Sequence, residues 1–459
     1  MMKRLQTYLV LGLALFLAGC EGPCEKISSI SAPDLTSGTA DFSSYVAVGT
    51  SISAGYQSGG VVDRHQIKAF PAIFAQQVGK TVLQNGQGSF TFPSINQDGI
   101  PALLEIKSYS PLIVNNVGRT TGAPMNFSQN FSYNNMGVPG AVALDFADTT
   151  NYYTTNYPLY RSNFTFFNTV VRGRGSILQQ TLSLAPTFIS YEYGSNEVLG
   201  AATAGVSTTV FPTASYAALL NGHLNAIHAL APNAKLALFT VPDVTSIPFC
   251  TTFPPATVSL TTGQPVPLIG PGPASLATGD LVLLTASDSL ALGTGIPLGA
   301  YNFVNPAAPG NGRPLLDRQV LNVVEVAIIE AAITGMNAAI ESESQRAWVA
   351  KVDMGGILAD VAANGLRIGG TLYTSDFITG GLFSLDGVHP NDLAHAVLTN
   401  AMIASVNTRF GATIPSIRPL DYASDNASRM QPARIEGDAY PTEMGGLEDS
   451  FKALFPWRR

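Results

Sequence analysis

A serine that could act as a nucleophile stands directly after the first buried run of the chain. Residues 49–55 read Gly-Thr-Ser-Ile-Ser-Ala-Gly and follow the apolar segment 45–48. A serine at a strand-to-helix turn has an exposed hydroxyl, and its amide lies near the positive end of a helix. Serine and glycine also form ordinary turns. Ser51 is therefore a candidate nucleophile that still needs a base.

Residues 385–390, Leu-Asp-Gly-Val-His-Pro, offer that base just before the last predicted helix. A carboxylate three residues before an imidazole can hold the ring, so that its other nitrogen is free to face a serine. Asp386 and His389 are therefore the candidate acid and base. A histidine beside a proline is more often structural. His65 is the rival base, because it lies soon after Ser51.

Two further turns could supply hydrogen-bond donors. Residues 134–141, Asn-Asn-Met-Gly-Val-Pro-Gly-Ala, contain two glycines that let the backbone approach a bound group closely. Residues 191–197, Tyr-Glu-Tyr-Gly-Ser-Asn-Glu, end a predicted strand and carry Asn196, whose amide can donate to an oxyanion. Each segment taken alone is a common turn, and only their occurrence together in one chain points to a catalytic site.

In order along the chain, the four segments resemble the four blocks of the SGNH hydrolase superfamily, also called GDSL esterases and lipases. The resemblance extends from about residue 45 to residue 395. It implies a nucleophile, a base pair and three oxyanion donors, which are Ser51, then Asp386 with His389, and then the amides of Ser51 and Gly140 with the side chain of Asn196. It also implies a flavodoxin-like three-layer α/β/α sandwich with a central parallel sheet, and an activity that needs no metal or organic cofactor.

Two positions depart from the family pattern. Thr50 stands where the family usually has Asp before the nucleophile, and Glu197 stands where Asp commonly follows Asn196. Position 50 is not the acid of the triad, so we expect Thr50 to alter how the turn is held. The chain has no Gly-x-Ser-x-Gly segment, which counts against the ordinary α/β-hydrolase fold.

Strands and helices alternate along the chain, which is the pattern of an α/β fold. The sequence predicts strands over residues 45–48, 187–193, 236–241 and 348–352, and helices over residues 67–78, 216–230, 317–341 and 391–408. The strands are mostly apolar on both faces, as in a parallel sheet that helices cover on each side.

One hydrolase domain over residues 42–418 accounts for this distribution of segments. Residues 81–131 and 245–313 do not fit the alternation and are long for loops of a compact domain. We interpret them as insertions that either form part of the substrate pocket, with residues 245–313 as a candidate lid, or lie on the surface with no catalytic part. Residues 20–41 are rich in Ser, Thr, Pro and Gly, which favours a tether, and residues 419–459 form a polar C-terminal extension.

The first residues indicate export. A basic start is followed by an apolar run over residues 5–19, shorter than the roughly 20 residues that span a bilayer. Its end, Leu-Ala-Gly before Cys20, resembles the bacterial lipoprotein cleavage box, so residues 1–19 are interpreted as a signal peptide and Cys20 as the lipidated residue. The alternative is a plain secretory signal. We expect no later stretch to be long and apolar enough to cross a membrane, and the sequence does not indicate which membrane holds the anchor.

Charge and cysteine content narrow the possible partners. Without residues 1–19, which hold two basic residues and no acidic one, the net charge is about −9, which argues against nucleic acid. If Cys20 is acylated, Cys24 and Cys250 remain as a possible disulfide in an oxidising compartment, or as two unpaired thiols. The cysteines lack the paired spacing of a zinc site.

Together these observations predict an exported, membrane-anchored serine esterase that acts through an acyl-enzyme. The apolar insertion over residues 245–313 and the membrane anchor favour lipid-like acyl esters as substrates. Two alternatives remain open: a carbohydrate O-deacetylase, and a catalytically idle surface lipoprotein that binds glycan or lipid in the same pocket. The expected partners are an ester substrate and the membrane through Cys20. The oligomeric state is not indicated.

Overall fold

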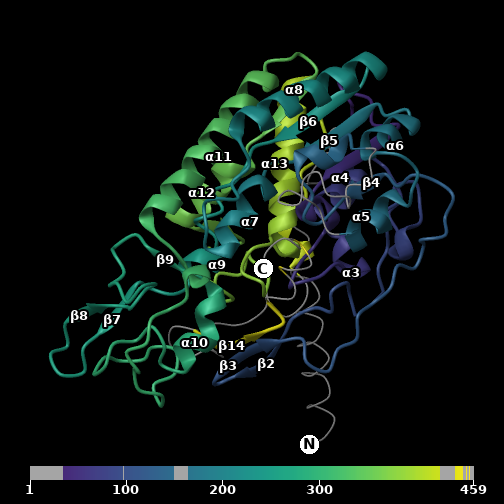
Figure 1. The fold of residues 1–459 in the computed structure, drawn as a ribbon. Coiled ribbons are helices and arrows are strands. Elements are labelled where there is room, and N and C mark those ends of the chain that lie inside the picture. The colour runs from purple at the N-terminus through teal and green to yellow at the C-terminus, as the bar shows by residue number, and fades with distance from the viewer. Residues whose placement is uncertain are drawn as a thin grey trace, which may run out of the picture.

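The computed structural model describes residues 35–96, 98–148, 164–423, 440–447, 451 and 454. The predictions for the signal peptide, for most of the tether, and for Cys20 and Cys24 lie outside these residues. Within them, a five-stranded parallel sheet occupies the centre of the molecule (Figure 1).

The central sheet has the strand order β11-β6-β5-β1-β4. Its strands are β1 (Tyr45–Gly49), β4 (Asn135–Gly137), β5 (Phe188–Glu192), β6 (Lys235–Phe239) and β11 (Val349–Val352). Every neighbouring pair is parallel. Numbered by their place in the chain, the strands run 2-1-3-4-5 across the sheet, which is the flavodoxin-like order. The predicted fold class is therefore confirmed.

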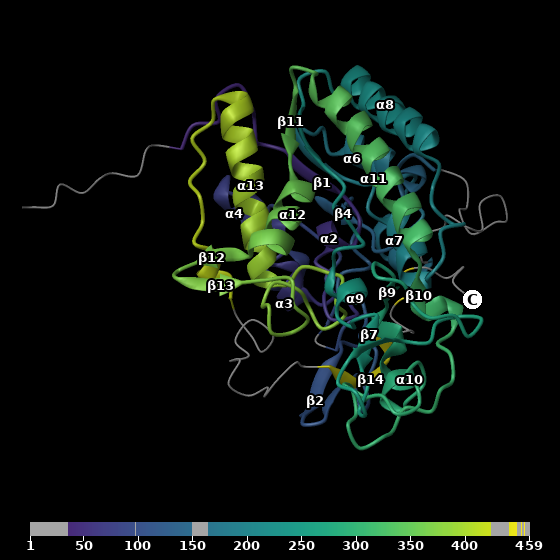
Figure 2. The same ribbon diagram turned by 90° about the vertical axis from the view of Figure 1, so that its left-hand side faces the viewer.

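Helices cover both faces of this sheet (Figure 2). One face carries α4 (Phe70–Gln77) and α13 (Asp392–Phe410), and the other carries α6 (Ile177–Ser183), α8 (Thr213–Leu230) and α11 (Val323–Ser344). Alternate residues of each strand point to opposite faces. Val46 and Val48 accordingly belong to the core cluster with α8 and α11, whereas Ala47 belongs to the cluster with α4 and α13.

Helix α11 differs from the sequence expectation in its apolar length and in the residue at which it begins. By length and composition this helix could cross a membrane, which the sequence analysis had not recognised. In the structure its face with Ile329, Ile333 and Met336 is buried against α8 and the sheet. The helix begins at Val323 and not at residue 317, because Asn322 caps the amides of the first turn.

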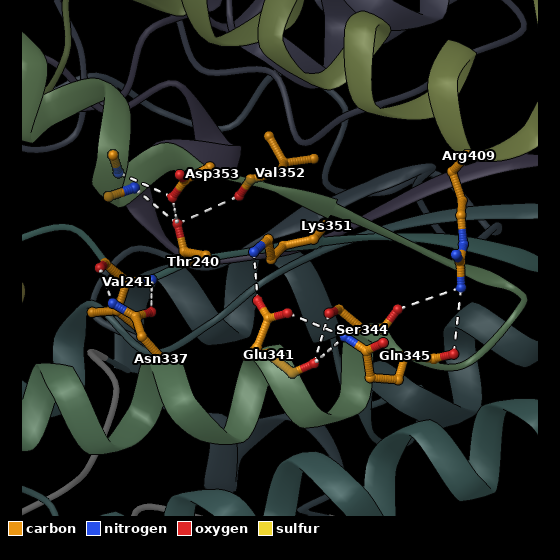
Figure 3. Close-up of polar contacts among 12 residues, drawn as sticks. Thr240, Val241, Asn337, Glu341, Ser344, Gln345, Lys351, Val352, Asp353 and Arg409 are labelled. Atoms are coloured by element: carbon orange, nitrogen blue, oxygen red, sulfur yellow. Dashed lines mark hydrogen bonds and ion pairs between the residues drawn. The ribbon is translucent and has the colours of Figure 1, made fainter.

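Polar contacts tie α11 to the C-terminal end of β6 (Figure 3). The side chain of Asn337 accepts from the amide of Val241 at 2.8 Å and donates to its carbonyl oxygen at 2.9 Å. The Thr240 hydroxyl donates to Asp353 at 3.1 Å, where α12 (Met354–Asn364) begins. These bonds fix the end of β6 between two helices, at the strand edge where ligands bind in such sheets.

The two insertions form small elements of their own. Residues 81–131 contain β2 (Glu105–Tyr109) and β3 (Leu112–Asn115). Residues 245–313 contain α9 (Pro248–Thr251), β7 (Ala256–Val258), β8 (Pro265–Pro267), β9 (Leu281–Val282) and α10 (Ser287–Ala291). The other short elements are α2 (Ser51–Ala54), α3 (Asp63–Gln66), α5 (Phe164–Val171), α7 (Asn196–Ala204), β10 (Val320–Leu321), β12 (Leu366–Ile368) and β13 (Thr371–Tyr373).

Described parts of both predicted terminal extensions pack on the domain. At the N-terminal side, the amide of Thr39 donates to the carbonyl oxygen of Phe410 at 2.8 Å, so the chain is docked before residue 42. At the C-terminal side, β14 (Pro441–Gly445) pairs in parallel with β3, and Leu447 is buried. Figure 1 shows β2, β3 and β14 together at one end of the molecule, and Figure 2 shows β2 and β14 at that end as well.

Candidate active site

The four segments that the sequence analysis singled out meet at the C-terminal edge of the central sheet. Ser51 follows β1 and begins α2, a single helical turn that ends at Gly55 with a left-handed φ of 75°. Asn196 begins α7 after β5, and Gly140 follows β4. His389 lies in the loop that leads into α13. Parallel strands place these loops side by side, because their carboxyl ends share one edge.

Ser51, His389 and Asp386 form a line of hydrogen bonds. The Ser51 Oγ lies 2.9 Å from Nε2 of His389, and Nδ1 of His389 lies 3.0 Å from Oδ2 of Asp386. All three side chains are buried, with exposures of 2% or less. The ring of Tyr56 packs on the His389 ring, with 4.6 Å between centroids. A hydroxyl, an imidazole and a carboxylate in this order can raise the nucleophilicity of the serine.

Asp386 is held by donors from its own turn and from a distant one. Its Oδ1 accepts from the amides of Val388 and His389, each at 2.9 Å. Its Oδ2 also accepts from the amide of Gly59 at 3.0 Å. Burial alone raises the pKa of this carboxyl, but the nearby His389 and these amides outweigh burial and lower the Asp386 pKa. Asp386 is thus kept ionised beside the imidazole.

The expected oxyanion donors lie in the turns that follow β1, β4 and β5. The side chain of Asn196 donates to the carbonyl oxygen of Ala141 at 2.8 Å, which ties it to the loop of Gly140. Gly140 has a φ of +81°, and a Cβ there would lie 2.3 Å from the carbonyl oxygen of Leu454. Only glycine fits such a position. Among the described residues, the amides of Ser51 and Gly140 have no hydrogen-bond acceptor.

Glu197 supports the loop that follows Gly140. Its Oε1 accepts from the amide of Ala143 at 2.6 Å, while no described group pairs with its Oε2. Burial raises the pKa of Glu197 to about 8, which its contact with Ala143 only partly opposes. The raised pKa favours the protonated, neutral form of this carboxyl at pH 7.

An apolar pocket opens beside Ser51. Its wall comes mostly from α12, β12, α13 and the loop before α13, with the side chains Met354, Ile357, Val361, Leu366, Phe383 and Leu398. Figure 2 shows α12 and α13 beside α2. From the insertion 245–313 only Ile247 reaches the pocket. Most of the lining thus comes from residues 354–398, where the sequence analysis had singled out residues 385–390 and the last helix but not α12, because its apolar residues resemble those of any core helix.

The rival base His65 is paired with Asp392, whereas the imidazole that contacts Ser51 is His389. Its Nδ1 lies 2.8 Å from Asp392, which also accepts from Lys68 at 3.0 Å and from Gln57 at 2.7 Å. This cluster joins α3 to the start of α13. His65 therefore takes part in a structural contact and does not occupy the position of the base.

The other histidines also pack in the structure. The Tyr191 hydroxyl lies 2.9 Å from Nδ1 of His223, and the ring of His228 stacks on Trp348 at 4.9 Å. His395 is fully buried and accepts from the amide of Phe70. Burial lowers the pKa of both His223 and His395 to about 4, so each is neutral at pH 7.

Cys250 is buried, and its thiol donates to the carbonyl oxygen of Val244 at 3.5 Å. Burial raises the pKa of this thiol far above its usual range. Its predicted pairing with Cys24 stays a prediction, because Cys24 lies outside the described residues. Among the described residues, no cluster of three or more His, Cys, Asp or Glu side chains could hold a metal ion.

The C-terminal segment touches two parts of the site. The ring of Phe451 packs on Phe249 with 4.9 Å between centroids, and the amide of Phe249 donates to Gly387 within the turn of Asp386 and His389. Leu454 reaches Gly140, as described above. A segment that the sequence predicted to be a polar extension therefore contacts the candidate site.

The family model described as GDSL-like lipase/acylhydrolase matches residues 45–402. The chain belongs to this family of hydrolases. None of the curated proteins matches it. Among solved structures it is similar to an extracellular lipase from Streptomyces rimosus, with 13% identity and a TM-score of 0.32, over 79% of this chain and 98% of that chain.

Proposed function

We propose that the protein is a serine carboxylic-ester hydrolase with Ser51 as its nucleophile. The observation that carries this proposal is the line from Ser51 through His389 to Asp386, which is buried and ends at an apolar pocket. Family membership supports hydrolysis as the reaction class. In this proposal His389 takes the Ser51 proton while the serine oxygen attacks the ester carbonyl.

The oxyanion that forms in this attack needs donors in place before the reaction. The amides of Ser51 and Gly140 and the side chain of Asn196 are our proposed donors. His389 then protonates the leaving alcohol, and an acyl-enzyme remains on Ser51. Water, activated by His389, attacks this acyl group and releases the acid. Every proton moves through one imidazole, whose ring Asp386 holds in place.

The acyl part of the substrate is proposed to be an apolar chain. The pocket beside Ser51 is lined mostly by apolar side chains, many of them from α12, α13 and the loop before α13. Burying each methylene of a chain in such a pocket contributes about 0.8 kcal/mol. A lipid-like acyl ester fits this wall better than the acetyl group of a polysaccharide, which offers one methyl group.

Hydrolysis of p-nitrophenyl esters from acetate to palmitate tests the proposal, with Ser51→Ala measured in parallel. We expect rates that depend on Ser51 and are highest at medium or long chains. Activity restricted to acetate would favour the deacetylase. Folded protein that neither hydrolyses esters nor reacts with a fluorophosphonate at Ser51 would favour the idle binding lipoprotein.

The pocket assignment has its own test on α12. Val361→Phe adds volume to the wall of the pocket, and we expect the ratio of palmitate to butyrate turnover to fall about tenfold or more. Ala362→Phe is the matched control, because Ala362 is exposed on the same helix. An unchanged ratio in Val361→Phe would place the acyl chain elsewhere.

We also propose that Cys20 carries a lipid that anchors the exported protein to a membrane of the bacterial envelope. The support is the signal-like segment 1–19 and its Leu-Ala-Gly end. Replacement of Cys20 by Ser should move the protein from the membrane fraction to the soluble fraction while esterase activity stays unchanged. Retention in the membrane fraction would contradict the anchor.

A further inference from the structure

Strand β5 ends on a buried acid that the proposed chemistry does not use. Glu192 is 1% exposed and follows four buried residues of the strand. It pairs in register with Gly49 of β1, one residue before the turn that carries Ser51. A charged residue type inside an apolar strand is a signal in the sequence, although it does not say which group the acid meets.

The Glu192 carboxyl binds the residues on both sides of Ser51. Its Oε2 accepts from the amide of Thr50 at 3.0 Å, from the amide of Ser53 at 3.3 Å and from the Ser53 hydroxyl at 2.9 Å. The Thr50 hydroxyl lies 3.0 Å from both carboxyl oxygens. One side chain therefore collects four donors from the four-residue stretch that presents the nucleophile.

The neighbouring backbone leaves room for this carboxyl. A Cβ at Gly49 would lie 2.8 Å from Oε2 of Glu192 and 2.3 Å from Oγ of Ser53. From the other side, Asn135 of β4 donates to the carbonyl oxygen of Ser53 at 2.8 Å. The turn is thus fixed by β4 and β5 together, and Gly49 makes the second contact possible.

We propose that Glu192 is the positioning residue of the nucleophile: it sets the backbone of residues 50–53 so that Ser51 Oγ meets Nε2 of His389. The proposal rests on the proposed role of Ser51. It also accounts for Thr50, which stands where the family usually has Asp. In this chain a carboxyl reaches the same turn from β5, and Thr50 supplies a donor to it.

The contacts define what a substitution must keep. All the groups that face Oε2 are donors, so an oxygen acceptor at this point satisfies them whether or not the side chain is charged. Burial raises the pKa of Glu192 to about 7, against which its bonds to Thr50 and Ser53 act. Glutamine retains the acceptor oxygen, and its amide nitrogen can donate to the Thr50 hydroxyl. Alanine retains neither.

Glu192→Ala and Glu192→Gln are therefore the informative pair in the full chain. Because a displacement of about 1 Å at a catalytic group can reduce turnover about a hundredfold, we expect kcat of Glu192→Ala to fall about a hundredfold with KM nearly unchanged. Glu192→Gln should stay within about fivefold of the wild type. Wild-type kcat in folded Glu192→Ala overturns the proposal, as does an equal fall in both variants.

Thr50→Val tests the same contact if Glu192→Ala does not fold. This variant removes one hydroxyl donor to Glu192 and keeps the amide and the shape, and an approximately tenfold fall in kcat supports the proposal. An unchanged kcat overturns it. Asp280→Asn is the matched control for a buried acid, since Asp280 accepts from the amides of Ala277 and Val323 and has no bond to the turn.

The labelling rate of Ser51 by a fluorophosphonate separates this proposal from the proposed function. This probe reports the reactivity of the serine without an ester substrate. If wild-type protein is labelled but hydrolyses no ester, the substrate assignment fails, and slower labelling of Glu192→Ala still supports positioning. If wild type and Glu192→Ala are labelled at the same rate, the positioning role is overturned, whatever the substrate.

Discussion

Two turns meet at the bond between Ser51 and His389, and each is held by a buried carboxyl. Asp386 accepts two amides of its own turn, and Glu192 accepts two amides of the turn around Ser51. Burial raises the pKa of both groups. Yet the Asp386 pKa ends below its usual value, whereas that of Glu192 rises to about 7.

The difference comes from the partner and not from the number of amides. Asp386 lies 3.0 Å from an imidazole that can carry positive charge, while the groups bonded to Glu192 are neutral donors. At Glu192 the bonds from Thr50 and Ser53 lower the pKa but do not offset the effect of burial. In our proposals the negative charge of Asp386 is therefore needed in the reaction, whereas Glu192 is needed to hold the backbone of residues 50–53. Substitutions that keep shape but remove charge should distinguish them.

The largest effect is expected from Asp386→Asn. The amide keeps a similar shape, but it loses the charge and can hold His389 in the wrong tautomer, so we expect kcat to fall on the order of ten-thousand-fold. Ester turnover of folded protein is the measurement. The same swap in Glu192→Gln is the internal comparison, and a loss of similar size in both variants would remove the distinction between the two carboxyls.

Gly49→Ala should disturb the turn of residues 50–53, which Glu192 holds, and leave the turn of Asp386 and His389 in place. The new methyl group would meet Glu192 and Ser53 at 2.8 Å or less, so we expect kcat to fall about a hundredfold. Overpacking of this kind also lowers the free energy of unfolding by about 1–3 kcal/mol. Turnover and urea midpoint are measured together. Wild-type turnover in a destabilised variant would show that the turn tolerates displacement of its carboxyl.

Glu197 is a third buried carboxyl, and we expect its protonation to change the stability of the folded protein with pH. Its pKa is about 8 in the folded protein against 4.5 as the ordinary value. Between these pH values the folded protein holds a proton that the unfolded chain has lost, so the free energy of unfolding falls as pH rises through this window. Glu197→Gln cannot ionise. We therefore expect the melting temperature of the wild type to fall more between pH 5 and pH 9 than that of Glu197→Gln; parallel curves would contradict a neutral Glu197.

The smallest effect is expected from Ser384→Ala. The Ser384 hydroxyl donates to Asp386 at 3.0 Å and accepts from the amide of Ser58. Asp386 keeps its three backbone donors and His389 after this change, so we expect a two- to fivefold fall in kcat, equivalent to about 1 kcal/mol or less. Turnover on the preferred ester is the measurement. A fall in kcat as large as that of Asp386→Asn would show that Asp386 needs the Ser384 hydroxyl to stay ionised.

Much of the scaffold was predictable, because strands and helices leave local patterns. The predicted strand over residues 187–193 corresponds to β5, and the predicted helix over residues 391–408 to α13. The edge strand β4 was missed, since three residues are too few to show a period. The predicted helix over residues 67–78 corresponds to α4, which begins three residues later with Pro71 in its first turn, and the short α3 before it was not predicted.

The order of the chemical residues along the chain was already visible in the sequence. Ser51, Asn196 and Gly140 follow strand ends, and parallel strands bring such ends to one edge, so short segments were enough to nominate them. Asp386 and His389 are three residues apart, and their contact is a local one.

Only the tertiary structure decided which distant groups support that chemistry. Glu192 meets Thr50 across 142 residues of chain, α12 and α13 contribute to one pocket with α2 and α7, and β14 pairs with β3. Apolar periodicity shows that a residue is buried but not against what, and a lone acid in a strand does not name its donors. These contacts depend on strand order and helix packing, which no segment of the sequence contains by itself.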